Sequence, residues 1–181
     1  MTLKKANAAL GLLTIALLLI HVVYTLTCFI LFVHNPKVNA LIAHLCVAAT
    51  AMHAVLGICI VVFAHDGSTL RRYPKENIRT IMQRASALGI LVILGLHAKA
   101  FAIATGGGNG LQIAIILQTL FFTFVFMHIA TSLSNAFVTL GWLDDMDKKK
   151  KIDRVVWVLC ALIWIAAVII VGSTFAKIAS H

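Results

Sequence analysis

The sequence has little charge and few acidic residues. Only 12% of its 181 residues are charged and only six are Asp or Glu, whereas 61% are hydrophobic and the mean hydropathy is +1.01. Soluble domains carry about a quarter charged residues and roughly half apolar ones, so this composition excludes an ordinary soluble fold. Apolar stretches of about 20 residues, long enough to cross a bilayer, recur along the chain. We therefore expect one transmembrane domain over residues 1–181.

A metal-binding cysteine motif is also missing. The four cysteines lie inside apolar runs, and none forms a CxxC or other metal-ligand spacing, which favours small buried hydrophobic side chains. The chain has neither a solenoid-type repeat nor a low-complexity segment. Its first apolar run lacks a small-residue cleavage site and is too long for a signal peptide, so we expect a retained helix.

The apolar runs predict five membrane-spanning helices. They lack the period-2 alternation of barrel strands, and only helices or closed barrels can span lipid. Turn chemistry separates them, at HNPK (34–37), the polar stretch 65–79, GGGNG (106–110) and LDDMDKKKKID (143–153). The expected fold is all-α, a five-helix transmembrane bundle with helices at about 8–33, 38–64, 80–105, 110–141 and 153–178.

Basic residues indicate the orientation of these helices. Of the 15 Lys and Arg residues, all but Lys37, Lys99 and Lys177 fall at the N-terminus or in the second and fourth connections. The positive-inside rule then predicts a multi-pass protein of the cell inner (cytoplasmic) membrane, with its N-terminus in the cytoplasm and its C-terminus outside. The net charge of +9 would sit on the cytoplasmic surface, where it suits anionic lipid or an acidic partner. Because topology explains this charge, we expect no nucleic-acid partner.

Four histidines lie deep inside the predicted helices. At 1.5 Å per residue, His21 and His97 fall in the outer half of the membrane and His53 and His128 in the inner half, roughly 10 Å apart along the normal. Ionisable residues inside a membrane are costly and usually functional. The four residues come from four different helices and pair by height.

Two histidines facing each other across a helix bundle suit the iron of one bound porphyrin. The four positions therefore predict a four-helix core with two haem groups, which would form an electron path across the bilayer. The alternative is that each histidine is a packing residue bonded to a neighbouring carbonyl. The pairing by height favours haem over packing.

His44 competes with these residues. It precedes His53 by nine residues, which places the two side chains on opposite faces of one helix. His44 is an alternative ligand in place of His21 or His97, a residue for proton transfer at an outer quinone pocket, or a side chain that snorkels to the interface. The remaining histidines lie at or beyond the membrane boundaries and are expected to be solvated: His34, His65 and His181.

The segment YPKENIRTIMQRASALGILVILGLH, residues 73–97, resembles the cytochrome b membrane subunits of succinate dehydrogenases and fumarate reductases. In that family a Ser or Thr, an Arg four residues later and a pair of small residues lead into a helix with a haem histidine. The stretches HAVLGICIVVFAH (53–65) and HIATSLSNAFVTLGW (128–142) resemble the second and fourth helices of the family. The residues that match the first motif are Thr80, Arg84, Ser86 and Gly89, before His97.

The resemblance implies two haem b groups. Five-helix members of the family carry ligands on the first four helices and none on the fifth. Carried over to this sequence, His21 and His97 would hold the outer haem, and His53 and His128 the inner one.

The resemblance also implies contacts with quinone and with haem propionates. Thr80 and Arg84 match positions that bind quinone in one-haem relatives, and Ser86 belongs to the same motif. Arg84 alternatively binds a propionate of the inner haem, or anchors the cytoplasmic end of its helix. Lys99 meets an outer propionate or snorkels. Some relatives carry membrane carboxylates for proton movement, whereas we expect none in the spans or outer loops here.

By this resemblance the chain is a membrane anchor that passes electrons between an iron–sulfur subunit and membrane quinone. The iron–sulfur subunit would dock on the cytoplasmic loops 65–79 and 143–153, and a partner flavoprotein would interconvert succinate and fumarate. Two histidines would occupy both axial positions of each haem iron, so the subunit alone would be non-catalytic. The alternatives are an anchor of another membrane dehydrogenase, such as a hydrogenase or formate dehydrogenase, or a haem-free transport or assembly protein. Against transport, no half-helix break marks a midplane substrate site.

Overall fold

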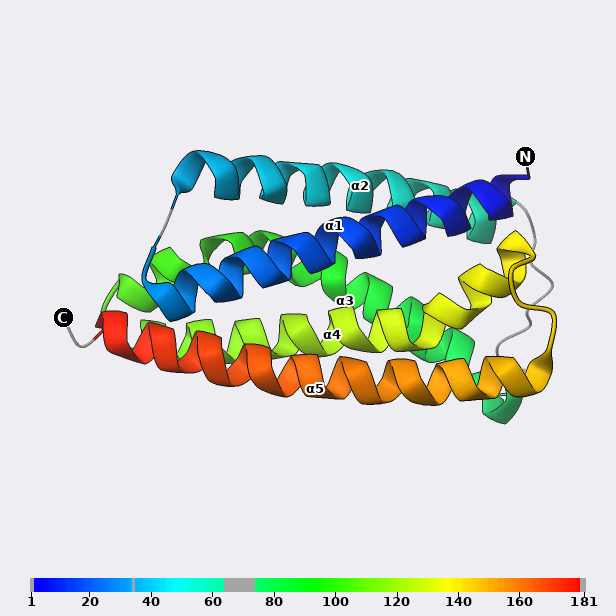
Figure 1. Cartoon of the computed structure of the whole chain (residues 1–181). Coiled ribbons are helices and arrows are strands. Elements are labelled where there is room, and N and C mark those ends of the chain that lie inside the picture. Colours follow the sequence, from blue (N-terminus) through cyan, green and yellow to red (C-terminus); the bar gives the residue numbers. More distant parts are fainter. Residues whose placement is uncertain (1, 34, 64–73, 180–181) are drawn as a thin grey trace.

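The computed structural model describes residues 2–33, 35–63 and 74–179, and they form five long helices (Figure 1). Each helix is long and apolar enough to cross a membrane, and the described residues contain no strand. The expected all-α fold with five helices is confirmed, and the chain is a multi-pass membrane protein. The helices are α1 (Leu3–Leu31), α2 (Pro36–Phe63), α3 (Pro74–Thr105), α4 (Gly110–Leu140) and α5 (Met146–Ala179).

Three helices begin earlier than their apolar residues indicate. α1 begins at Leu3 rather than residue 8, α3 at Pro74 rather than residue 80, and α5 at Met146 rather than residue 153. Hydropathy marks only the part of a helix that lies in lipid, whereas Lys, Glu and Met continue a helix into water at little cost. The polar stretch expected at 65–79 is therefore helical from residue 74, and its residues 65–73 lie outside the described ones.

Polar caps determine where several helices begin and end. The Asn35 side chain accepts hydrogen bonds from the backbone amides of Lys37 and Val38, at 3.1 and 3.2 Å, directly before Pro36 opens α2. Proline suits this first helical position because the amide it lacks would have no partner there. In the same way, the Asp145 carboxylate accepts from the backbone amide of Asp147 at 2.7 Å at the start of α5.

Glycines make the connection between α3 and α4 short. Gly107 and Gly108 adopt φ angles of 83° and 56°, a region that side chains with a Cβ rarely enter. A Cβ on Gly110 would overlap the carbonyl oxygen of Ile103, so only glycine fits where the chain turns back. The turn predicted at GGGNG is thus present, and it sets α4 antiparallel to α3.

The bundle is built around α4. This helix packs against α3 and α5 on two sides and against α1 on a third, whereas α2 packs extensively against α1 alone among the described helices (Figure 1). α1 and α3 do not pack extensively against each other, and neither do α2 and α4. The α4 helix carries the largest buried set, which is Ala114, Gln118, Phe121, Val125, Phe126, Ala130, Thr131 and Ser134.

The two ends of the bundle differ in charge. The N-terminus, the end of α2, the start of α3 and the α4–α5 connection lie together at one end, which Figure 1 shows opposite the C-terminus. Lys4, Lys5 and the run of lysines at 148–151 belong to this end, which we call the basic end. The α1–α2 and α3–α4 connections lie at the opposite end with the last residues of α5.

Candidate functional site

Two pairs of histidine rings meet inside the bundle. His21 of α1 faces His97 of α3, with ring centres 6.4 Å apart and ring planes at 76°. We call these residues the outer pair, because they lie nearer the end opposite the basic end. His53 of α2 faces His128 of α4, with ring centres 6.2 Å apart and planes at 74°, and we call them the inner pair.

Both pairs join helices that are not neighbours. α1 contacts α2 and α4, and α3 contacts α4, so α1 and α3 stand diagonally across the core, as do α2 and α4. Long side chains must therefore cross the space between the helices in each pair. The histidine rings do this at two levels, one in each half of the bundle.

The separation of the rings fits one metal ion between two imidazoles. First-row metals bind an imidazole nitrogen at about 2.0–2.1 Å, and a ring nitrogen lies about 1.2 Å from its ring centre. Two imidazoles on opposite sides of one metal then stand roughly 6.4–6.6 Å apart between ring centres. The observed values of 6.4 and 6.2 Å agree with this spacing to within a few tenths of an ångström.

One ring of each pair is held by a hydrogen bond at Nδ1. His97 Nδ1 lies 2.6 Å from the side-chain oxygen of Gln118, and His128 Nδ1 lies 3.0 Å from the backbone oxygen of Gln83. Each oxygen can only accept, so each Nδ1 carries the proton and each Nε2 keeps its lone pair. This is how metal-binding histidines are oriented, because the second nitrogen donates to a neighbouring carbonyl.

The other ring of each pair is less firmly held. Nδ1 of His21 is buried without a hydrogen-bond partner among the described residues, whereas the His53 ring is within reach of the Asn7 backbone. A buried nitrogen that is left unpaired costs free energy. Together, the two pairs have the donor chemistry that bis-histidine haem requires.

Two glycines beside His53 affect the space around the ring. A Cβ at Gly11 of α1 would stand 3.0 Å from His53 Cε1, so the absence of a side chain lets the ring lie against α1. A Cβ at Gly57, one turn from His53 on the same helix, would meet nothing within 4 Å. Gly57 therefore does not serve close helix contact.

The residues do not suggest a metal ion held by protein ligands alone. Within the described ranges, no group of three or more His, Cys, Asp or Glu side chains comes together. A zinc ion would take three or four protein ligands, whereas haem iron takes its equatorial ligands from the porphyrin and only two from protein. Pairs of histidines match the second case.

Other residues singled out in the sequence lie apart from the pairs or beside only one of them. His44 is exposed on α2, on the face opposite His53, and Lys99 is exposed on α3. Ser86 is fully buried, and its hydroxyl lies 3.4 Å from His128 Nδ1, so it faces the inner pair. Thr80 and Arg84 are half-buried near the basic end. His34, His65 and His181 lie outside the described residues.

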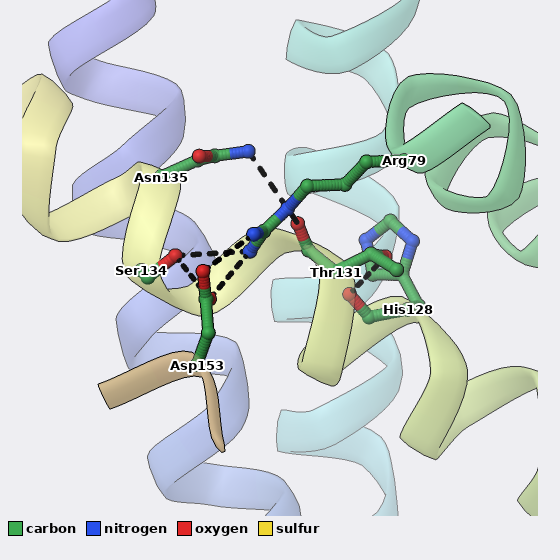
Figure 2. A network of polar contacts seen from close by, with 6 residues as sticks. All are labelled: Arg79, His128, Thr131, Ser134, Asn135 and Asp153. Atoms are coloured by element: carbon green, nitrogen blue, oxygen red, sulfur yellow. Dashed lines mark hydrogen bonds and ion pairs between the residues drawn. The ribbon is translucent and has the colours of Figure 1, made fainter. Parts of the chain in front are cut away.

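A polar network near the inner pair was not expected from the sequence. Arg79 of α3 donates two bonds to the Asp153 carboxylate, at 2.7 and 2.8 Å, and one to the Thr131 carbonyl at 2.7 Å (Figure 2). Ser134 donates to the same carboxylate at 2.6 Å and accepts from Arg79 at 2.9 Å. The network joins α3, α4 and α5 one turn from His128, because Thr131 also bonds the His128 carbonyl at 3.1 Å.

Asp153 lies where the predicted connection 143–153 meets the predicted fifth helix 153–178, and the structure places it about two turns inside α5, which begins at Met146. The helix therefore continues through the lysine run. Inside α5 this acid is held in a bidentate ion pair rather than in a solvated loop.

Comparison with known proteins does not identify a family for this chain. No protein-family model, curated protein or solved structure matches the chain. The functional argument therefore depends on the residues described above.

Proposed function

We propose that this chain is a di-haem cytochrome b membrane anchor, which carries electrons between a cytoplasmic iron–sulfur subunit and membrane quinone. The observation that supports this function is the crossed arrangement of the two histidine pairs, with ring centres 6.4 and 6.2 Å apart. A packing role does not require four rings from four helices to meet two by two at the spacing of axial ligands.

The roles of the residues follow from their contacts. His21 and His97 would hold one haem b, and His53 and His128 would hold the other. Each haem would carry one electron at a time. Gln118 and the Gln83 carbonyl orient one ring of each pair. The surrounding apolar helices exclude water. Because two histidines would hold each haem, its iron would have no site for a substrate, and the chain would transfer electrons without catalysing a substrate reaction.

The proposed orientation places the basic end in the cytoplasm, following the positive-inside rule. An iron–sulfur subunit would dock there, near the inner pair, and a flavoprotein that interconverts succinate and fumarate would bind that subunit. The α4–α5 connection and the lysine run at the start of α5 belong to this surface. In this proposal Thr80 and Arg84 serve quinone or an inner propionate, and Lys99 serves an outer propionate.

The deciding experiment is the haem content of the purified protein, with a reduced-minus-oxidised visible spectrum. We expect two b-type haems per chain. His128→Ala should remove one haem and His97→Ala the other, because the two pairs share no ligand. His44→Ala is the matched control, an exposed histidine on α2, and should keep both.

Other outcomes would contradict the proposal in different ways. A protein without haem from haem-replete cells would indicate a transport or assembly protein. Two haems with a co-purifying nickel or molybdenum enzyme would indicate the anchor of a hydrogenase or formate dehydrogenase instead.

A further inference from the structure

A single amide side chain lies buried in the apolar middle of α4. Gln118 is 7% exposed and lies within the run IAIILQTLFF. Burying an amide is costly unless its polar atoms are bonded. Both ends of this side chain reach the same residue of α3, since Oε1 lies 2.6 Å from His97 Nδ1 and Nε2 lies 3.5 Å from the His97 carbonyl oxygen.

These two contacts fix the orientation of the amide. The backbone oxygen of His97 can only accept, so the nitrogen of Gln118 must face it. The oxygen of Gln118 must then face the ring, and an oxygen can only accept. His97 is thereby held with its proton on Nδ1 and its lone pair on Nε2.

The His97 ring is also restrained from its faces. Phe121 of α4 stacks on it, with ring centres 4.2 Å apart and planes at 17°, and Phe122 approaches with its ring centre 6.3 Å away. Three side chains within about one turn of α4 therefore fix the orientation of the His97 ring: Gln118, Phe121 and Phe122. His21, the other ring of the outer pair, has no bond at Nδ1 among the described residues.

The inner pair is held differently. His128 Nδ1 bonds the backbone oxygen of Gln83, which no side-chain substitution removes. The side chain of Gln83 takes no part in that bond. The Ser86 hydroxyl lies 3.4 Å from the same nitrogen, but the backbone oxygen of Gln83 is the nearer acceptor. The outer pair therefore differs in that its nearest acceptor is a replaceable side chain.

We propose that Gln118 is the positioning residue of the outer haem. In this inference, which rests on the proposed function, Gln118 holds the Nδ1–H tautomer of His97 and increases the basicity of Nε2. A more basic axial ligand stabilises the oxidised iron, so Gln118 lowers the reduction potential of the outer haem and strengthens its retention. The inner haem is insensitive to this residue.

The test compares Gln118→Leu and Gln118→Glu with one control glutamine, Gln112. Gln118→Leu keeps a similar volume without the acceptor, and it should raise the midpoint potential of one haem and weaken its retention by about 10–100-fold. Gln118→Glu retains an acceptor and should restore retention. Gln112→Leu, exposed on the same helix, should leave both potentials unchanged. An unchanged outer potential in Gln118→Leu would overturn the inference.

A second measurement does not need haem. Nitrogen NMR of histidine-labelled, haem-free protein should show the Nδ1–H tautomer for His97, and a mixture biased toward Nε2–H in Gln118→Leu. If the native protein contains no haem, the proposed function fails while this measurement still tests the Gln118–His97 contact. If His97 shows the Nε2–H tautomer in the native protein, the positioning role is wrong even when two haems are bound.

Discussion

At the scale of single residues, the position of the inner pair depends on a missing side chain. His53 lies against α1 where Gly11 leaves room, with 3.0 Å between His53 Cε1 and the place that a Cβ would occupy. That distance is already shorter than ordinary van der Waals contact. A larger residue on α1 must therefore move the ring or the helix that carries it.

Gly11→Leu should displace His53 and remove the inner haem, while the outer haem remains. The measurement is haem content per chain together with the potentials of the remaining haem. Gly57→Ala is the control, because a Cβ there meets nothing within 4 Å, and it should keep both haems. Retention of both haems in Gly11→Leu would show that α1 does not constrain His53.

The buried amide shows what sequence reasoning can and cannot reach at this scale. Depth along each helix was sufficient to pair His21 with His97 and His53 with His128, because rise per residue converts directly to height. Gln118 and Gln83 were not identified, since their contacts depend on how two helices are rotated about their axes. A lone amide in an apolar run was the only signal for Gln118.

At the scale of helices, an ion pair fastens three elements at the basic end. The side chains of Arg79 and Asp153 are 29% and 20% exposed, and their bidentate contact includes Ser134 of the helix between them (Figure 2). A hydrogen-bonded pair with this little exposure contributes more than a solvated surface pair. It also restrains α4 one turn from His128.

Arg79→Gln should destabilise the protein by about 1–3 kcal/mol, because it leaves the Asp153 carboxylate without its charged partner. Thermal unfolding in detergent measures this loss. Asp147→Asn is the matched control, because Asp147 pairs with Lys150 at 3.3 Å in an exposed position, and it should change stability by less than about 0.5 kcal/mol. Equal losses of stability in the two variants would mean that the network stabilises the protein no more than an exposed ion pair does.

The number of helices and the glycine turn were predictable, whereas the helix starts were not. Hydropathy detects the residues that lipid requires to be apolar, so it found five helices and the break at GGGNG. It cannot detect the polar turns that extend α1, α3 and α5, because caps and helix propensity set their limits. The Arg79–Asp153 pair was missed for this reason, since the two residues stand at the ends of the polar stretches predicted at 65–79 and 143–153.

At the scale of the whole molecule, charge and topology make an orientation testable. Alkaline phosphatase fused after the last residue of the chain should be active outside the cell, and the same enzyme fused at residue 145 should be inactive. A fusion in the α3–α4 connection, at residue 107, is the control for the outer side and should be active. The reverse pattern would place the basic end outside and remove the cytoplasmic docking surface from the proposal.

The position of α2 at the margin of the bundle has a consequence for the abundance of the protein in a cell. Its extensive packing is against α1 alone, yet His53 reaches across to α4. A cofactor bound by both rings would link α2 to α4 and add its binding free energy to the contacts that α2 makes with α1. Starvation for haem should then leave an incompletely closed bundle, and membrane proteases would make the abundance of this chain follow the haem supply.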